Sequence, residues 1–345
     1  MNRFRHSRSV PRDVALLIGA LCLGLAGCDD PVALEAGTPM VLELRGLQAL
    51  DPALDGTYEL WAFRDGEAAH IARVVLPADS AAAALTELEF ELPFARPDSI
   101  LLGVAPPGDP GTAPPAAHLL EGRFRGDVAE LTIEGAVTDG RPLVREPGHH
   151  SLFTTSNNVE LGYPSFENAG LWMFSISISI NPHGNRFVHL TPLTRAWTYE
   201  GWIVYRPGMP EETWISFGKY RPDLYGMLTS RDNTGSGVFS GDEDYLNAGV
   251  EDVPGEEWHT NLFGYPVPGG FELPLALDAV DADGVALWYH TITIEPVFDE
   301  SEPLFSERPF PLRPYRNPIG EGGPGIPRKI LYRDNDPSGV VRPRR

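Results

Sequence analysis

The stretch Tyr199-Glu200-Gly201-Trp202-Ile203-Val204 has a counterpart earlier in the chain, Tyr58-Glu59-Leu60-Trp61-Ala62-Phe63. Each copy follows a segment with spaced leucines and leads into a charged turn that ends in glycine. Repeated segments of this kind mark duplicated structural units. In an extended strand, tyrosine would lie on one face of each copy, with glutamate and tryptophan on the other. The sequence therefore predicts two related β-units, each built around one copy.

Short strand patterns separated by turn residues run through most of the chain. The clearest are 86–92, where glutamate alternates with apolar residues, and 171–180, where serine does so. Glycine and proline total 36 + 34 = 70 residues, which favours many turns over long helices. We expect an all-β protein with two tandem Ig-like β-sandwich units. The predicted units span 38–137 and 151–305, with a polar connector at 138–150.

The N-terminus has the features of an export signal. Four arginines precede an uncharged run of 14 residues, 14–27, which is shorter than the roughly 20 residues of a membrane-spanning helix. The run ends in Leu25-Ala26-Gly27-Cys28, which resembles the lipobox of bacterial lipoproteins. We expect residues 1–27 to be removed and Cys28 to carry the lipid. The protein would then be exported, held to a membrane through Cys28 and a tether at 28–37, and face the periplasm or cell exterior.

Composition narrows the choice of partners. After removal of the signal, 23 basic and 47 acidic residues remain, a formal net charge of 23 − 47 = −24. Nucleic acid requires basic contacts, so we expect no nucleic-acid partner. Cys22 lies in the predicted signal and Cys28 would be acylated, so no disulfide is expected.

The last forty residues differ from the rest. Residues 306–345 contain eight prolines, nine basic and four acidic residues. A proline-rich basic segment of this kind is typical of extended or disordered chain. We expect a flexible tail that lies along the acidic body or meets an acidic partner.

The second unit resembles the extracytoplasmic domain of anti-sigma-K factors and related bacterial lipoproteins. The resemblance rests on the Tyr199-Glu200-Gly201-Trp202 strand, on Phe217-Gly218-Lys219-Tyr220 and on the ending Ile294-Glu295-Pro296. It implies a β-sandwich fold. It does not imply sigma-factor binding, because the helical cytoplasmic half and membrane helix of that family do not precede the β-domain here.

Motifs that carry chemistry are sparse. No H-E-x-x-H, G-x-S-x-G, P-loop or G-x-G-x-x-G pattern occurs, so we expect no catalytic residues, no cofactor and no metal. Two acidic turns, 241–244 and 278–284, contain carboxylates but lack the complete pattern of a calcium loop. Asp-Gly is also a common hairpin turn, and we favour that interpretation.

Tryptophan is concentrated in the second unit. Core packing explains most of these side chains, but exposed rings bind sugars and protein partners. Trp197 and Trp258 lie near predicted loops, and Trp202 lies on the face opposite Tyr199. We interpret these three tryptophans as a candidate binding surface.

The favoured function is a non-enzymatic binding or structural role in the cell envelope, with an envelope protein or glycan as partner. One alternative is a hydrolase of envelope polymers that uses loop carboxylates in 223–270, namely Asp232, Asp242, Asp244, Glu256 and Glu257. Another is an envelope signalling component related to anti-sigma factors. The sequence does not predict an oligomeric state.

Overall fold

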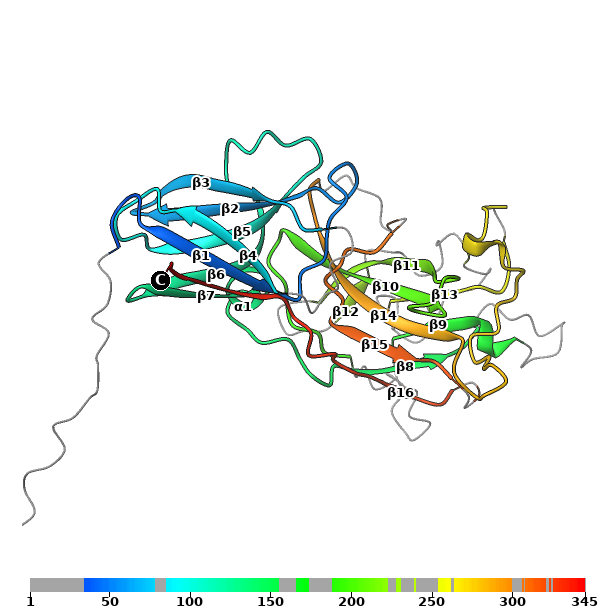
Figure 1. The fold of residues 1–345 in the computed structure, drawn as a ribbon. Coiled ribbons are helices and arrows are strands. Elements are labelled where there is room, and N and C mark those ends of the chain that lie inside the picture. The colour runs from blue at the N-terminus through cyan, green and yellow to red at the C-terminus, as the bar shows by residue number, and fades with distance from the viewer. Residues whose placement is uncertain are drawn as a thin grey trace, which may run out of the picture.

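The protein is built almost entirely of antiparallel strands arranged in two lobes (Figure 1). The computed structural model describes residues 34–77, 85–154, 166–173, 188–222, 228–230, 239, 254–261, 264–299, 306, 308–320, 323 and 325–344. Its described helices are limited to one α-helical turn, α1 (Ile133–Ala136), and two short 3-10 turns. The all-β prediction is confirmed.

The first unit is one eight-stranded antiparallel sheet with the order β3-β2-β5-β6-β7-β17-β1-β4. The sheet curls until its edge strands β3 and β4 approach each other, and a core of leucine, valine and alanine lies inside. The strands are β1 (Pro39–Arg45), β2 (Thr57–Arg64), β3 (Glu67–Val74), β4 (Thr86–Glu91), β5 (Ser99–Ala105), β6 (Ala117–Arg125), β7 (Val128–Thr132) and β17 (Ser338–Pro343).

The second unit has two sheets. A five-stranded sheet has the order β12-β11-β10-β14-β15, and a four-stranded sheet has the order β13-β9-β8-β16. Phe217 from one sheet contacts Trp258, next to the other, with ring centroids 6.2 Å apart. The strands are β8 (Gly148–Leu152), β9 (Gly170–Trp172), β10 (Trp197–Tyr205), β11 (Thr213–Pro222), β12 (Leu228–Ser230), β13 (Gly255–Glu257), β14 (Trp288–Pro296), β15 (Tyr315–Pro318) and β16 (Arg328–Ile330).

Local sequence explains several of these strands. In β4 the three glutamates are exposed and the residues between them are half-buried, as a period of two requires for a sheet with one wet face. β5 and β14 are instead buried along almost their whole length. Their runs of leucine, isoleucine and threonine suit strands that are covered on both faces.

The prediction of a flexible C-terminal tail is wrong. β17 is an internal strand of the first sheet, where it pairs with both β1 and β7, and β15 and β16 belong to the second unit. Val341 is fully buried. The tail's positive charge is used within the fold, because Arg342 pairs with Glu43 and Arg344 pairs with Glu89.

The predicted unit boundaries change accordingly. The first unit is discontinuous, since it combines residues before 138 with β17 from the end of the chain. The expected connector, 138–150, already contains part of β8, which starts at Gly148. The chain therefore passes from the first unit into the second and returns to finish the first.

Some predictions fall outside the described residues. These are the signal, the lipidation site Cys28, most of the 171–180 strand beyond β9, and Asp232, Asp242 and Asp244. Within the described ranges, none of the helices has the length and apolar character needed to cross a membrane.

Candidate functional site

The repeated stretch forms the same structure in both units. Thr57-Tyr58-Glu59-Leu60-Trp61 lies on β2 and Thr198-Tyr199-Glu200-Gly201-Trp202 on β10. Each strand pairs with the next strand in the chain, so that Glu59 lies opposite Arg73 and Glu200 opposite Lys219. Both pairings shift register between the glutamate and the tryptophan, and such a bulge increases the local twist.

The tyrosines have equivalent roles. Each points into the core and uses its hydroxyl to hold the chain segment that precedes its strand. The Tyr58 hydroxyl donates to the Gln48 carbonyl at 3.0 Å, and the Tyr199 hydroxyl donates to the Thr191 carbonyl at 2.9 Å. Burial raises the pKa of both tyrosines above the ordinary value, so both hydroxyls stay protonated and can donate.

In the first unit, the buried glutamate is neutralised by basic side chains. The Glu59 carboxylate lies 2.6 Å from Arg73 Nε and 2.6 Å from His70 Nε2, and it accepts a hydrogen bond from the Thr57 hydroxyl. Arg73 also donates to the Asp109 carbonyl, which belongs to the Pro/Gly loop that covers this face. These contacts hold the buried Glu59 side chain in place, so we assign Glu59 a structural role.

In the second unit, the corresponding glutamate has an acidic neighbour. Glu200 lies opposite Thr293 on β14, and Glu295 lies two residues further along that strand, opposite Thr198. Both carboxylates are buried. Burial raises the pKa of Glu200. Burial, together with the negative charge of Glu200, raises the pKa of Glu295 to about 8. The pair therefore binds a proton near neutral pH.

These two carboxylates hold the chain segment that leads to the C-terminal strands. Glu200 accepts a hydrogen bond from the Ser306 backbone N–H at 2.6 Å. Both oxygens of Glu295 accept from the Phe310 backbone N–H, at 3.0 and 3.1 Å. We call residues 306 and 308–313 the crossing segment. Its backbone N–H groups lie against both carboxylates, which are buried.

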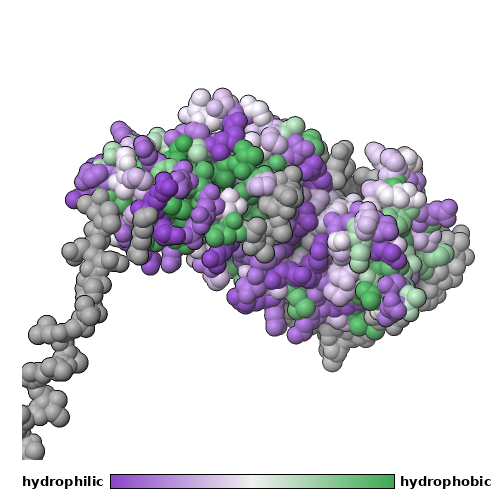
Figure 2. Space-filling model, viewed as in Figure 1, coloured by the Kyte–Doolittle hydropathy of each residue, from purple (hydrophilic) through white to green (hydrophobic). Residues whose placement is uncertain are grey.

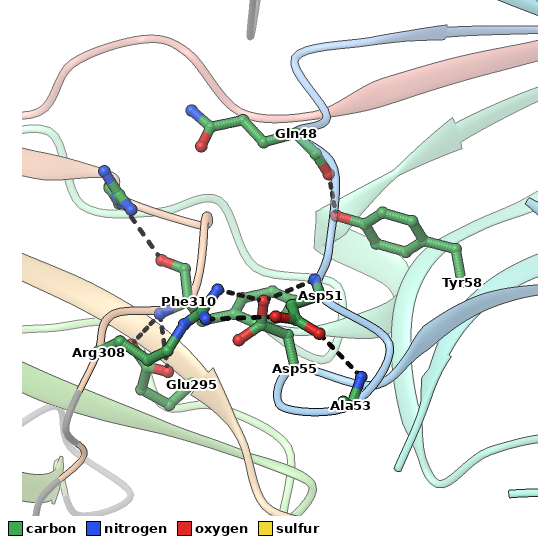
Figure 3. Close-up of polar contacts among 9 residues, drawn as sticks. Gln48, Asp51, Ala53, Asp55, Tyr58, Glu295, Arg308 and Phe310 are labelled. Atoms are coloured by element: carbon green, nitrogen blue, oxygen red, sulfur yellow. Dashed lines mark hydrogen bonds and ion pairs between the residues drawn. The ribbon is translucent and has the colours of Figure 1, made fainter. Parts of the chain in front are cut away.

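The crossing segment also joins the two units. Arg308 Nη2 lies 2.9 Å from Asp55 Oδ2, and its Nη1 lies 3.7 Å from Asp51 Oδ2. Figure 3 shows Arg308 reaching the two aspartates close to Phe310 and Glu295. One short segment therefore connects the acidic loop before β2 with the buried carboxylates of the second unit.

A histidine pair links the two sheets of the second unit. His150 on β8 and His290 on β14 approach to 3.1 Å between their Nδ1 atoms. Burial lowers the pKa of His150 and lowers that of His290 to about 3, so both rings are neutral at physiological pH. The Nε2 atoms of both rings are buried without a hydrogen-bond partner. No group of three or more metal-binding side chains occurs among the described residues.

The candidate tryptophan surface must be corrected. Trp197, Trp202 and Trp258 are all fully buried. Trp202 does lie on the outer face, as its alternation predicts, but its Nε1 donates to Thr293 Oγ1 and its ring packs against Trp214. Trp197 Nε1 donates to the His118 carbonyl of the first unit. The rings pack the fold and its junction and offer no surface to a partner.

The acidic residues considered for a hydrolase site or a calcium site have structural roles where the structure describes them. Glu256 and Glu257 lie on β13 and are buried. Asp281 Oδ1 accepts from the backbone N–H groups of Asp283 and Val285, which is the arrangement of a side-chain-stabilised turn. Asp278 accepts from Asn168.

Two neighbouring clefts open on the described surface, and His118 lines both. One, of about 510 Å³, lies on the outer face of β5 and β6 and is lined by Phe63, Glu121 and Arg123, among others. The other, of about 460 Å³, lies between the units and is lined by residues such as Ala136, Arg195 and Phe298. We call them together the His118 clefts. Sequence reasoning missed them because β6 contains no recognisable motif.

A scan of protein-family models and searches of curated proteins and of solved structures found no match to this chain.

Proposed function

We propose that this protein is a lipid-anchored exported protein that binds an envelope component through its folded surface and performs no catalysis. The observation that carries the anchoring is the sequence Leu25-Ala26-Gly27-Cys28 behind a basic, then apolar, N-terminus. Only five residues separate Cys28 from Leu34, where the described chain begins. Six residue steps span at most roughly 20 Å, so lipid on Cys28 would hold the first unit close to the membrane.

The membrane-facing end would be the one that carries Leu34. The Leu34 carbonyl accepts from the Arg96 N–H, which places the 92–98 loop at that end. The Asp65 N–H donates to Asp98, which adds the turn between β2 and β3. The second unit would then project away from the bilayer. We propose the resemblance to anti-sigma-K extracytoplasmic domains only as a likeness of fold.

The His118 clefts are the surface that we propose for the partner. Two adjoining hollows of a few hundred Å³ each, lined by aromatic and polar groups, suit an extended segment of glycan or peptide. The Glu200–Glu295 pair fits a structural role better than a catalytic one, because backbone N–H groups of the chain itself occupy its oxygens.

Anchoring is tested by metabolic labelling with a fatty-acid analogue. The wild-type protein should take up label and sediment with membranes, and Cys28→Ala should do neither. Cys22→Ala, a cysteine in the predicted signal, is the matched control and should behave like the wild type. Equal labelling of the Cys28→Ala protein would refute the anchor.

Binding is tested by comparing two surface substitutions in envelope extracts. Glu121→Arg changes a residue of the His118 clefts, and Arg125→Glu changes an exposed residue of the same strand outside them. Specific retention of a glycan or protein by the wild type should be lost with the first change and kept with the second. Equal retention by both variants would show that the clefts do not bind the partner.

A further inference from the structure

Three arginines gather on the second unit although the chain is strongly acidic overall. Arg313 ends the crossing segment, Arg316 lies on β15, and Arg333 follows β16. The Arg333 backbone N–H donates to the Pro314 carbonyl, which places it beside the other two. Figure 2 shows hydrophilic residues across the part of the visible face where β15, β16 and the chain leading to β17 lie.

Two of these arginines share one aromatic ring. The guanidinium carbon of Arg313 lies 4.5 Å from the centroid of Trp214, and that of Arg316 lies 5.5 Å from the same centroid. The two guanidinium groups are therefore at most 4.5 + 5.5 = 10 Å apart. A cation–π contact restricts where a guanidinium group lies and does not use its N–H donors in a hydrogen bond.

The cations have no acidic partner at ion-pair distance. None of the salt bridges formed within the described residues involves Arg313, Arg316 or Arg333. Each side chain donates one hydrogen bond through its Nε atom. Arg313 donates to the Phe310 carbonyl, and Arg316 donates to Thr291 Oγ1. Among the described residues, the Nη groups of both arginines have no acceptor. Glu212 is the acid that acts on both arginines, and its oxygens already accept from Trp214 Nε1 and the Gly208 N–H.

The electrostatics favour an anion at this position. Burial and the charge of Arg316 lower the pKa of Arg313, and burial lowers the pKa of Arg316. The negative charges of Glu212, Glu295 and Asp55 offset part of this effect at Arg313, and that of Glu212 does so at Arg316, but half-buried like charges that lack a direct ion pair remain unfavourable in a folded protein. An anion that accepts from both guanidinium groups would relieve this repulsion.

We propose that Arg313 and Arg316, supported by Arg333 and by the Trp214 platform, form a binding site for a phosphate-bearing ligand. A tetrahedral phosphate presents enough oxygens to accept from two planar guanidinium forks at once, whereas one carboxylate satisfies only one fork. None of Trp214, Arg313, Arg316 and Arg333 lines the His118 clefts, so a test of this site is independent of the function proposed for the clefts.

The test is calorimetric titration of the purified protein with inorganic phosphate. The wild type should bind saturably with a dissociation constant of about 1 mM or below, and Arg313→Gln/Arg316→Gln should bind at least about tenfold more weakly. Arg125→Gln/Arg141→Gln removes the same charge from two exposed arginines elsewhere and should change affinity less than about twofold. Circular dichroism of each variant checks that the fold is retained.

Arg313→Lys/Arg316→Lys keeps both charges and loses the planar forks, so its affinity should fall between those of the wild type and the glutamine variant. Vesicles of phosphatidylglycerol, compared with phosphatidylcholine, identify the source of the phosphate. Sedimentation with the former that free phosphate reverses would assign a lipid headgroup; phosphate binding without sedimentation would assign a soluble or polymeric phosphate. Absence of saturable phosphate binding, or equal weakening in both glutamine variants, would overturn the proposal.

Discussion

The two hairpins built on Thr-Tyr-Glu-x-Trp differ mainly in how they neutralise one buried glutamate. Glu59 forms an ion pair with Arg73 Nε at 2.6 Å, and His70 Nε2 also lies 2.6 Å from its carboxylate. Glu200 instead shares its surroundings with Glu295, at the position where the first unit has Ala105. The same strand thus holds a carboxylate paired with an arginine in one unit and a proton-binding pair of carboxylates in the other.

This difference affects how each unit uses the end of the chain. The first unit covers Glu59 with a nearby loop and takes β17 as an internal strand. The second unit fastens the crossing segment with its two carboxylates. The duplicated framework therefore supports a fold in which the last forty residues complete both units.

The largest effect should come from removing β17. Deletion of residues 338–345 takes out the strand between β7 and β1 and exposes two new sheet edges, so we expect the first unit to lose cooperative folding. Hydrogen exchange should show lost protection in β1 and β7, with β10 and β14 affected less. An unchanged exchange pattern would contradict the assignment of β17 to the sheet.

The next effect distinguishes the two glutamates by pH. Because the pKa of Glu295 is raised from 4.5 to about 8, its stabilisation is complete below about pH 4.5 and is lost as pH rises through 8. Glu295→Gln, which stays neutral, should lose this dependence. The difference in unfolding free energy between wild type and variant should change by several kcal/mol, on the order of 4, between pH 5 and pH 9.

Glu59→Gln is the matched change in the first unit. Its carboxylate is already paired with Arg73, so the variant breaks that ion pair and should lose stability, with no relative gain in base. The neutral His150–His290 pair destabilises the fold below about pH 6.5, and comparison with the wild type at each pH removes that contribution. If the unfolding free energies of Glu295→Gln and Glu59→Gln changed with pH in the same way, the proposed difference between the two glutamate sites would be wrong.

A third prediction concerns the partner of Glu59. Arg73→Met removes the arginine from a fully buried carboxylate and leaves it the contacts with His70 and Thr57, and we expect a loss of about 3 kcal/mol in unfolding free energy. Arg344→Met removes an exposed pair with Glu89 and should cost less than about 1 kcal/mol. Chemical denaturation measures both, and equal losses would show that burial of Glu59 does not matter.

Part of this fold is visible in the sequence. Alternation predicts β4 correctly, and it places the tryptophan of each repeat on the face opposite the tyrosine. The Glu200–Glu295 pair could not be predicted, because the two glutamates lie on neighbouring strands almost a hundred residues apart in the chain. The only local signal is that Glu295 directly follows the uncharged run Thr291-Ile292-Thr293-Ile294.

The C-terminal strand was missed for a similar reason. Ser338-Gly339-Val340-Val341 is short and lies in basic, proline-rich chain, which by composition is typical of disorder. Its stability comes from pairing with β1, nearly 300 residues away. Local sequence patterns do not indicate with which distant strand a segment pairs. The excess of arginine in the tail over an acidic body was the one available clue, and Arg342–Glu43 is its outcome.

The smallest effect tests what the two hairpins have in common. Tyr58→Phe and Tyr199→Phe each remove one hydroxyl and leave a backbone carbonyl, of Gln48 or Thr191, without its donor. Each loss should cost about 1 kcal/mol, and the two costs should agree within about 0.5 kcal/mol because the repeats use the hydroxyl in the same way. Thermal unfolding with Tyr332→Phe as a less buried comparison measures them. A large cost in one repeat and none in the other would mean that the tyrosines, unlike the strands that carry them, no longer have equivalent roles.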